Sequence, residues 1–190
     1  MPSYYDFTIS LQDVLPRPWR RVLIRTTVSF AALHDVIQAA CGWADTHLYQ
    51  FHPAGLFDRD AVIASRDAGS AEPGGPPTPE GGRVRLARHF GTAGDVRRTT
   101  CLYWYDFGDD WVHDVQLNDV VQLPERFARR LVAGAHAFPP DDCGGPGGYA
   151  ALQDALRTGR DPDGLLDWAR DVWGWTGAYD EAEARGRVDR

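Results

Sequence analysis

The sequence predicts a single α+β domain, in which helices pack against a curved, mostly antiparallel sheet of about five to seven strands. Several short segments alternate apolar with polar residues, which is the pattern of half-buried strands. Residues 29–41 instead repeat their apolar residues at helical spacing, and further helical segments follow near the C-terminus. Because 190 residues is the length of one ordinary domain, we expect residues 1–190 to share one core.

The first elements are two strands, a helix and a third strand. Residues 5–11 alternate apolar and polar side chains, and WRRVLIR (19–25) has Val22 and Ile24 as its inward set. We interpret the arginines of 19–25, with Arg20 on the face opposite Arg21, as the solvated edge of a sheet. Ser29 is suited to cap the helix, which Gly42 ends, and HLYQFH (47–52) predicts the third strand.

The remaining chain predicts an insertion, a hairpin and a helical end. Glycine and proline dominate residues 68–82, so we expect a flexible surface insertion there. The next patterns predict strands at 83–90 and 99–107, a turn at 107–110 and a returning strand at 111–117. Residues 124–131 can be interpreted as a short helical stretch, and residues 138–149 as a rigid loop. Helices are predicted at 149–158 and 164–172, within a helical C-terminal part at about 149–185.

Charge and composition limit the classes of function. The net charge is −7, with residues 1–100 at +1 and residues 101–190 at −8, so an acidic second half would repel a phosphate backbone and makes nucleic acid an unfavourable partner. The sequence contains no apolar run of the roughly 18–20 residues that cross a bilayer. The three cysteines, Cys41, Cys101 and Cys143, are far apart, which favours reduced thiols. We therefore expect a cytoplasmic protein with no membrane partner.

The segment YDFGDDWVH (105–113) concentrates three aspartates and a histidine in nine residues. One interpretation is structural: Asp106 and Asp109 cap backbone N–H groups of the turn, and His113 is a core histidine that bonds one of these aspartates. The other is a metal or acid–base site, because carboxylates and imidazole bind divalent cations. Its ligands would be Asp106, Asp109, His113, Asp142 and His47. The residue pattern leaves both interpretations open.

Four segments in this order resemble the plasmid pRiA4b ORF-3-like protein family: PRPWRRVLI, LHDVIQAACGWADTHLYQF, YDFGDDWVHDVQL and PPDDCGGPGGYAAL. The resemblance implies an α+β domain found in bacteria, archaea and mobile elements such as plasmids, without an established activity. Some members are labelled resolvase-like, but this sequence shows neither the activated serine nor the helix-turn-helix of a serine resolvase. The family's signature positions fall on Trp19, Arg20, Arg21, His34, Gly42, Trp43, His47, Tyr105, Asp106, Gly108, Asp109, Trp111, His113, Pro139, Pro140, Asp142, Gly144, Gly145, Gly148 and Tyr149.

These observations favour a non-catalytic binding or interaction module that uses a groove between the 105–113 hairpin and the 138–149 loop. Its partner is an unidentified protein or small ligand, and no cofactor is predicted. One alternative is a metal-dependent hydrolase or nuclease that holds a divalent metal with the five residues named above, so whether the chain is an enzyme stays open. A second is a DNA-associated accessory protein of a mobile element. The expected binding residues are Trp19, Arg20, His47, Tyr105, Asp106, Asp109, Trp111, His113, Asp142 and Tyr149.

Overall fold

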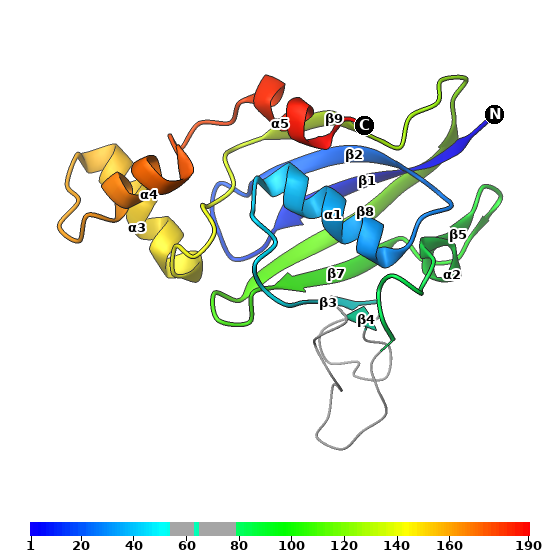
Figure 1. Cartoon of the computed structure of the whole chain (residues 1–190), viewed down its shortest axis with the longest axis horizontal. Coiled ribbons are helices and arrows are strands. Elements are labelled where there is room, and N and C mark those ends of the chain that lie inside the picture. Colours follow the sequence, from blue (N-terminus) through cyan, green and yellow to red (C-terminus); the bar gives the residue numbers. More distant parts are fainter. Residues whose placement is uncertain (54–62, 65–78) are drawn as a thin grey trace, which may run out of the picture.

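A seven-stranded antiparallel sheet is the centre of the structure (Figure 1). The computed structural model describes residues 1–53, 63–64 and 79–190. The strand order is β4-β3-β7-β8-β1-β2-β9, which confirms the predicted α+β class and the mostly antiparallel sheet. The strands of this sheet are β1 (Ser3–Leu11), β2 (Trp19–Arg25), β3 (Tyr49–His52), β4 (Ile63–Ala64), β7 (Thr100–Tyr105), β8 (Trp111–Gln122) and β9 (Arg129–Ala135).

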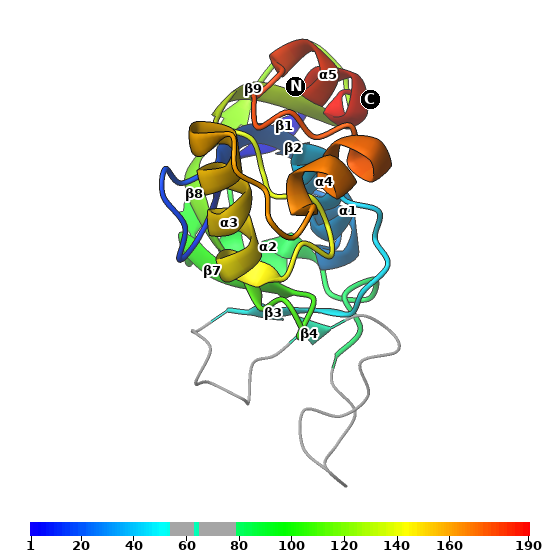
Figure 2. The same cartoon turned by 90° about the vertical axis from the view of Figure 1, so that its left-hand side faces the viewer.

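The helices pack on one face and at one end of this sheet. They are α1 (Phe30–Cys41), α2 (Leu86–Phe90), α3 (Gly145–Thr158), α4 (Leu165–Trp173) and α5 (Glu181–Val188). Figure 1 shows α1 across one face, α5 in red beside β9, and α3 and α4 beyond one end of the sheet. Figure 2 views the molecule from that end, with α3 and α4 towards the viewer. Among the described residues, no helix has the length and apolarity that crossing a bilayer requires.

The sequence explains both ends of α1. The side chain of Ser29 accepts a hydrogen bond from the Ala32 N–H at 3.4 Å, and Gly42 ends the helix with a left-handed φ of 83°. Phe30, Leu33 and Ile37 are fully buried against the sheet. The predicted helix, cap and stop signal are therefore all confirmed.

Four predictions about local structure were wrong. Residues 145–149, expected in the rigid loop, are the first residues of α3, because Gly144 and Pro146 suit a helix start. Residues 86–90, expected in a strand, form the short helix α2, and the separate two-stranded sheet of β5 (Gly91–Thr92) and β6 (Asp95–Val96) follows it. The end of 124–131, interpreted as helical, belongs to strand β9. Strand β2 is not an edge, because β1 and β9 pair with it on either side.

The predicted insertion at 68–82 lies outside the described residues except for its last four positions. There the Ala31 N–H donates to the Gly81 carbonyl at 3.1 Å, and the Gly81 N–H donates to the Ala64 carbonyl at 2.9 Å. The described end of this segment is thus fixed to β4 and to the first turn of α1.

Candidate functional site

The turn between β7 and β8 is built around Asp106. Its backbone is left-handed at φ 52°, and its carboxylate accepts a hydrogen bond from the Gly108 N–H at 2.9 Å. The Asp110 N–H closes the turn on the Asp106 carbonyl at 2.7 Å. Asp106 is thus a turn-capping residue, as the structural interpretation expected, and it is 8% exposed.

The 138–149 loop lies directly on this hairpin. The carboxylate of Asp109 accepts a hydrogen bond from the Gly144 N–H at 3.0 Å, so Asp109 binds the loop and not its own turn. The Tyr105 hydroxyl donates to buried Asp141 at 3.1 Å. A Cβ at Gly145, whose φ is 67°, would lie 2.6 Å from the Asp109 carbonyl oxygen, so only glycine permits this approach. Hairpin and loop therefore form one continuous wall.

Three of the five proposed metal ligands meet where the loop crosses the hairpin. His47 Nε2 lies 2.9 Å from a carboxylate oxygen of Asp142 and 3.6 Å from one of Asp106. One candidate ligand atom from each residue lies within 4.8 Å of the other two. His47 is partly exposed and Asp142 is exposed, so solvent reaches this carboxylate–histidine cluster.

The structure does not bring Asp109 and His113 into that cluster. Asp109 is bound to the loop, and His113 is fully buried in the core, where its Nε2 lies 3.9 Å from the Cys41 thiol. Burial lowers the pKa of His113 to about 3. His113 is a core histidine, as the structural interpretation expected, but its predicted bond to an aspartate was wrong because its neighbour is a cysteine.

The other proposed binding residues fall into two groups. Trp111, Tyr105 and Tyr149 are at most 3% exposed, and the Tyr149 hydroxyl donates to the Ala137 carbonyl at 2.8 Å. These three side chains support the wall from inside. Trp19 is half-buried in β2, and Arg20, next to it, is 2% exposed and points to the opposite side of the loop from the hairpin.

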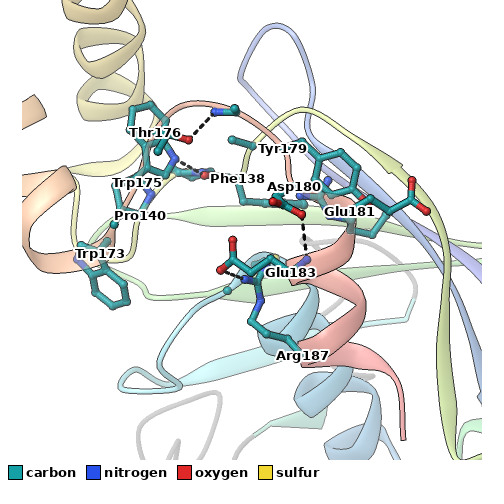
Figure 3. A pocket seen from close by; sticks show the side chains of 17 residues that line it. Phe138, Pro140, Trp173, Trp175, Thr176, Tyr179, Asp180, Glu181, Glu183 and Arg187 are labelled. Atoms are coloured by element: carbon teal, nitrogen blue, oxygen red, sulfur yellow. Dashed lines mark hydrogen bonds and ion pairs between the residues drawn. The ribbon is translucent and has the colours of Figure 1, made fainter.

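On that opposite side lies a pocket of about 510 Å³, which we call the C-terminal pocket. Its walls are the loop residues 137–140, the segment 173–180 that joins α4 to α5, the first turns of α5, and the end of α1. Figure 3 shows Trp173 and Trp175 on one side and Asp180 and Glu183 on the other. Sequence reasoning included Arg20 but missed the segment 173–180. The sequence signal of this segment was the aromatic cluster WGWTGAY, which matches no known binding motif.

Arg20 is held firmly beside this pocket. Its Nη1 donates to the carbonyls of Trp19, Ala135 and His136 at 2.8–3.0 Å. Its guanidinium carbon lies 3.9 Å from the ring centroid of Tyr179 and 4.9 Å from that of Phe138, which are cation–π distances. Burial lowers the pKa of Arg20 from its usual value, because the charged form loses its hydration.

Three residues that line the pocket each carry one buried polar atom without a hydrogen-bond partner in the described part of the chain. Arg20 Nε, Trp173 Nε1 and the Tyr179 hydroxyl are buried without any hydrogen-bond partner among the residues described. By contrast, Trp175 Nε1 donates to the Phe138 carbonyl at 2.8 Å. Buried polar groups in native proteins are nearly always paired. The three atoms at the pocket are among eight side-chain atoms of the described residues that are buried without a partner.

Comparison with known proteins agrees with this fold. The chain is similar to the uncharacterized protein y4hQ of Sinorhizobium fredii, at 31% identity over 154 residues that cover 81% of this chain and 73% of that protein. A crystal structure of MM3350, a protein of unknown function from Methanosarcina mazei Go1, has the same fold, with a TM-score of 0.76 at 24% identity over 95% of this chain and 96% of that one. The model of the plasmid pRiA4b ORF-3-like protein family matches residues 3–184. The chain therefore belongs to the plasmid pRiA4b ORF-3-like protein family, as its four sequence segments indicated.

Proposed function

We propose that this protein is a non-catalytic binding module whose ligand is a small molecule held in the C-terminal pocket. The observation that carries the proposal is that three residues lining the pocket, Arg20, Trp173 and Tyr179, each have one buried polar atom without a hydrogen-bond partner among the described residues. Each unpaired buried group costs roughly 1–3 kcal/mol, and a ligand that bonds it recovers part of that cost. The pocket volume of about 510 Å³ falls within the range of about 300–1,000 Å³ that is typical of small-molecule sites.

The chemistry of the pocket favours binding over catalysis. Cys41 is the nucleophilic side chain at its wall, and burial raises the pKa of this thiol well above its usual value. The thiol therefore stays protonated near neutral pH, whereas a nucleophilic cysteine has to be a thiolate. The proposed site thus lies on the other face of the 138–149 loop from the groove that the sequence suggested.

A variant that fills the pocket tests this proposal. Ala178 is exposed and lines the pocket, so Ala178→Trp places an indole at its mouth without disturbing the core. Ala151→Trp, on an exposed position of α3 that does not line the pocket, is the matched control. In a ligand-detected NMR screen of neutral, cationic and anionic fragments, we expect Ala178→Trp to abolish the hits and Ala151→Trp to keep them. Hits that survive Ala178→Trp unchanged contradict the proposal.

The carboxylate–histidine cluster favours a second candidate function, that of a metal-dependent hydrolase. His47, Asp106 and Asp142 offer one imidazole and two carboxylates, which suit a divalent transition metal once they close to about 2.0–2.2 Å. We expect Asp142→Asn to remove any binding of Mn²⁺ or Zn²⁺, measured by calorimetry. Asp110→Asn is the control, because Asp110 is also exposed and shares the φ of 61°. A wild-type protein that binds neither ion overturns this candidate.

A further inference from the structure

We infer that the ligand of the C-terminal pocket carries an oxyanion, a carboxylate or a phosphate group, which Arg20 binds. The inference rests on the proposed function, because it names the chemical class of the ligand for the same pocket. Four features of the described residues support it: the uncompensated charge of Arg20, the engagement of the acidic side chains nearby, an excess of hydrogen-bond donors, and aromatic walls.

The charge of Arg20 has no carboxylate partner among the described residues. Nη1 is fully used by three backbone carbonyls, while Nε and Nη2 form no hydrogen bond within the described part of the chain. A buried ion without a counter-ion is costly, and removing it from water costs several kcal/mol even after relaxation. Contact with the ring faces of Tyr179 and Phe138 offsets part of that cost, at roughly 0.5–2 kcal/mol for each such contact.

The acidic side chains around the pocket are already engaged. Glu183 pairs with Arg187 at 2.5 Å, and Glu181 pairs with Arg185 at 2.6 Å. Asp180 caps α5 by accepting a hydrogen bond from the Glu183 N–H at 3.0 Å. Glu181 and Glu183 are thus paired with arginines, whereas buried Arg20 has no ion-pair partner among the described residues. Asp180 has none there either, but it is exposed and water can solvate it.

The unpaired atoms are hydrogen-bond donors. Arg20 Nε and Trp173 Nε1 can only donate, and the Tyr179 hydroxyl can donate as well as accept. A ligand that bonds these donors must offer acceptor atoms. Carboxylates and phosphates offer several such oxygens, and their bonds to arginine are charge-assisted and roughly twice as strong as neutral ones.

The walls beside these donors are aromatic. Trp173, the last residue of α4, and Trp175, in the segment between α4 and α5, line the pocket (Figure 3). The ring of Tyr179 covers the Arg20 guanidinium. Indole and phenol rings favour flat or apolar groups. A planar body that carries an oxyanion therefore matches the two kinds of surface that the pocket presents.

Three small probes test the inference on the full chain: benzoate, phenyl phosphate and the neutral isostere benzamide. Calorimetry should show that benzoate or phenyl phosphate binds about tenfold or more tightly than benzamide, since a charge-assisted bond to Arg20 is lost in the amide. The stronger of the two anions then identifies the oxyanion. Replacing Arg20 would also remove three carbonyl contacts of the fold, so milder variants carry the test.

Tyr179→Phe and Trp173→Phe each delete one unpaired donor and keep an aromatic ring. We expect each to weaken anion binding about 3- to 10-fold. Trp104→Phe is the matched control, because it deletes a buried, unpaired indole N–H in β7 that does not line the pocket, and it should leave the affinity unchanged.

If benzamide binds as tightly as the anions and still loses affinity in Trp173→Phe, the oxyanion inference fails and the proposed function stands. If none of the probes binds, the oxyanion inference fails. If the affinity for the anions is the same in the wild type, Tyr179→Phe and Trp173→Phe, the anions bind elsewhere and both proposals fail.

Discussion

His113 provides a prediction about stability that can be worked out from its surroundings. Its imidazole is fully buried, its Nδ1 is without a hydrogen-bond partner among the described residues, and rings of Trp43, Tyr103 and Phe138 surround it at 5.3–5.9 Å. Burial lowers its pKa from 6.5 to about 3, because this apolar site cannot solvate an imidazolium. Below pH 6.5, His113 therefore becomes protonated in the unfolded chain but stays neutral in the folded chain.

The sign and size of the effect follow from proton linkage. The stabilisation from neutral His113 is complete above the unfolded pKa of 6.5 and is lost as the pH falls towards the folded pKa of about 3. One pKa unit corresponds to about 1.4 kcal/mol, so His113 should lower the free energy of unfolding by about 2 kcal/mol between about pH 7 and about pH 5. The full loss at still lower pH is about 5 kcal/mol.

Urea unfolding at a series of pH values measures this contribution. His113→Phe removes the titrating group and keeps a ring, so its free energy of unfolding should fall by about 2 kcal/mol less than that of the wild type over the same interval. His136→Asn is the control, because His136 is exposed and asparagine tolerates its left-handed φ of 62°. Equal acid sensitivity of His113→Phe and the wild type would refute the reasoning, and so would an NMR titration of His113 near pH 6.5.

Two further predictions concern the first turn of α3, which packs on the loop before it, and the cysteines. A Cβ at Gly148 would lie 1.7 Å from the Cys143 carbonyl oxygen, whereas a Cβ at Gly147 would meet no atom within 4 Å. In thermal unfolding, Gly148→Ala should therefore lower the free energy of unfolding by about 3 kcal/mol or more. Gly147→Ala should leave it unchanged or raise it by up to about 1 kcal/mol. Similar stability of the two variants would show that the loop is not packed as described. The three cysteines are free and buried, and burial raises the pKa of each thiol, that of Cys143 to about 12, so Ellman's reagent should react with them only at the rate of unfolding. Rapid reaction of any one in the folded state would contradict its burial.

Much of the fold could be predicted because local patterns and tertiary contacts agree. In the second half of β1, Phe7, Ile9 and Leu11 are buried while Thr8 and Ser10 are only partly buried, which matches the alternation of the sequence. Ser29 and Gly42 mark the ends of α1 through their own hydrogen bonds. The prediction of a strand at 83–90 was wrong because Leu86 and Phe90 are also four residues apart, a spacing that suits one face of a short helix. Strand β9 was missed because its arginines, leucine and alanines have high helix propensity. Pairing with β2 is what makes this segment a strand.

The site was less predictable because it depends on distances between remote segments. The cluster of His47, Asp106 and Asp142 was among the residues expected to converge, but no pattern distinguished it from His113, which shares a strand face with core side chains. Arg20 was correctly placed on the strand face opposite Arg21, but it was expected to be solvated and is 2% exposed. Its burial depends on Phe138 and on Tyr179, which is more than 150 residues away in sequence.

Binding of an oxyanion by Arg20 and its neighbours in the C-terminal pocket can be observed directly. The most direct test is a crystal structure of the full chain soaked with phenyl phosphate. We expect density for the anion in the C-terminal pocket, with a phosphate oxygen at about 2.7–2.9 Å from Arg20 Nε or Nη2 and the phenyl ring against the aromatic wall. A phosphate bound at the carboxylate–histidine cluster or elsewhere, with the pocket left to solvent, would contradict it.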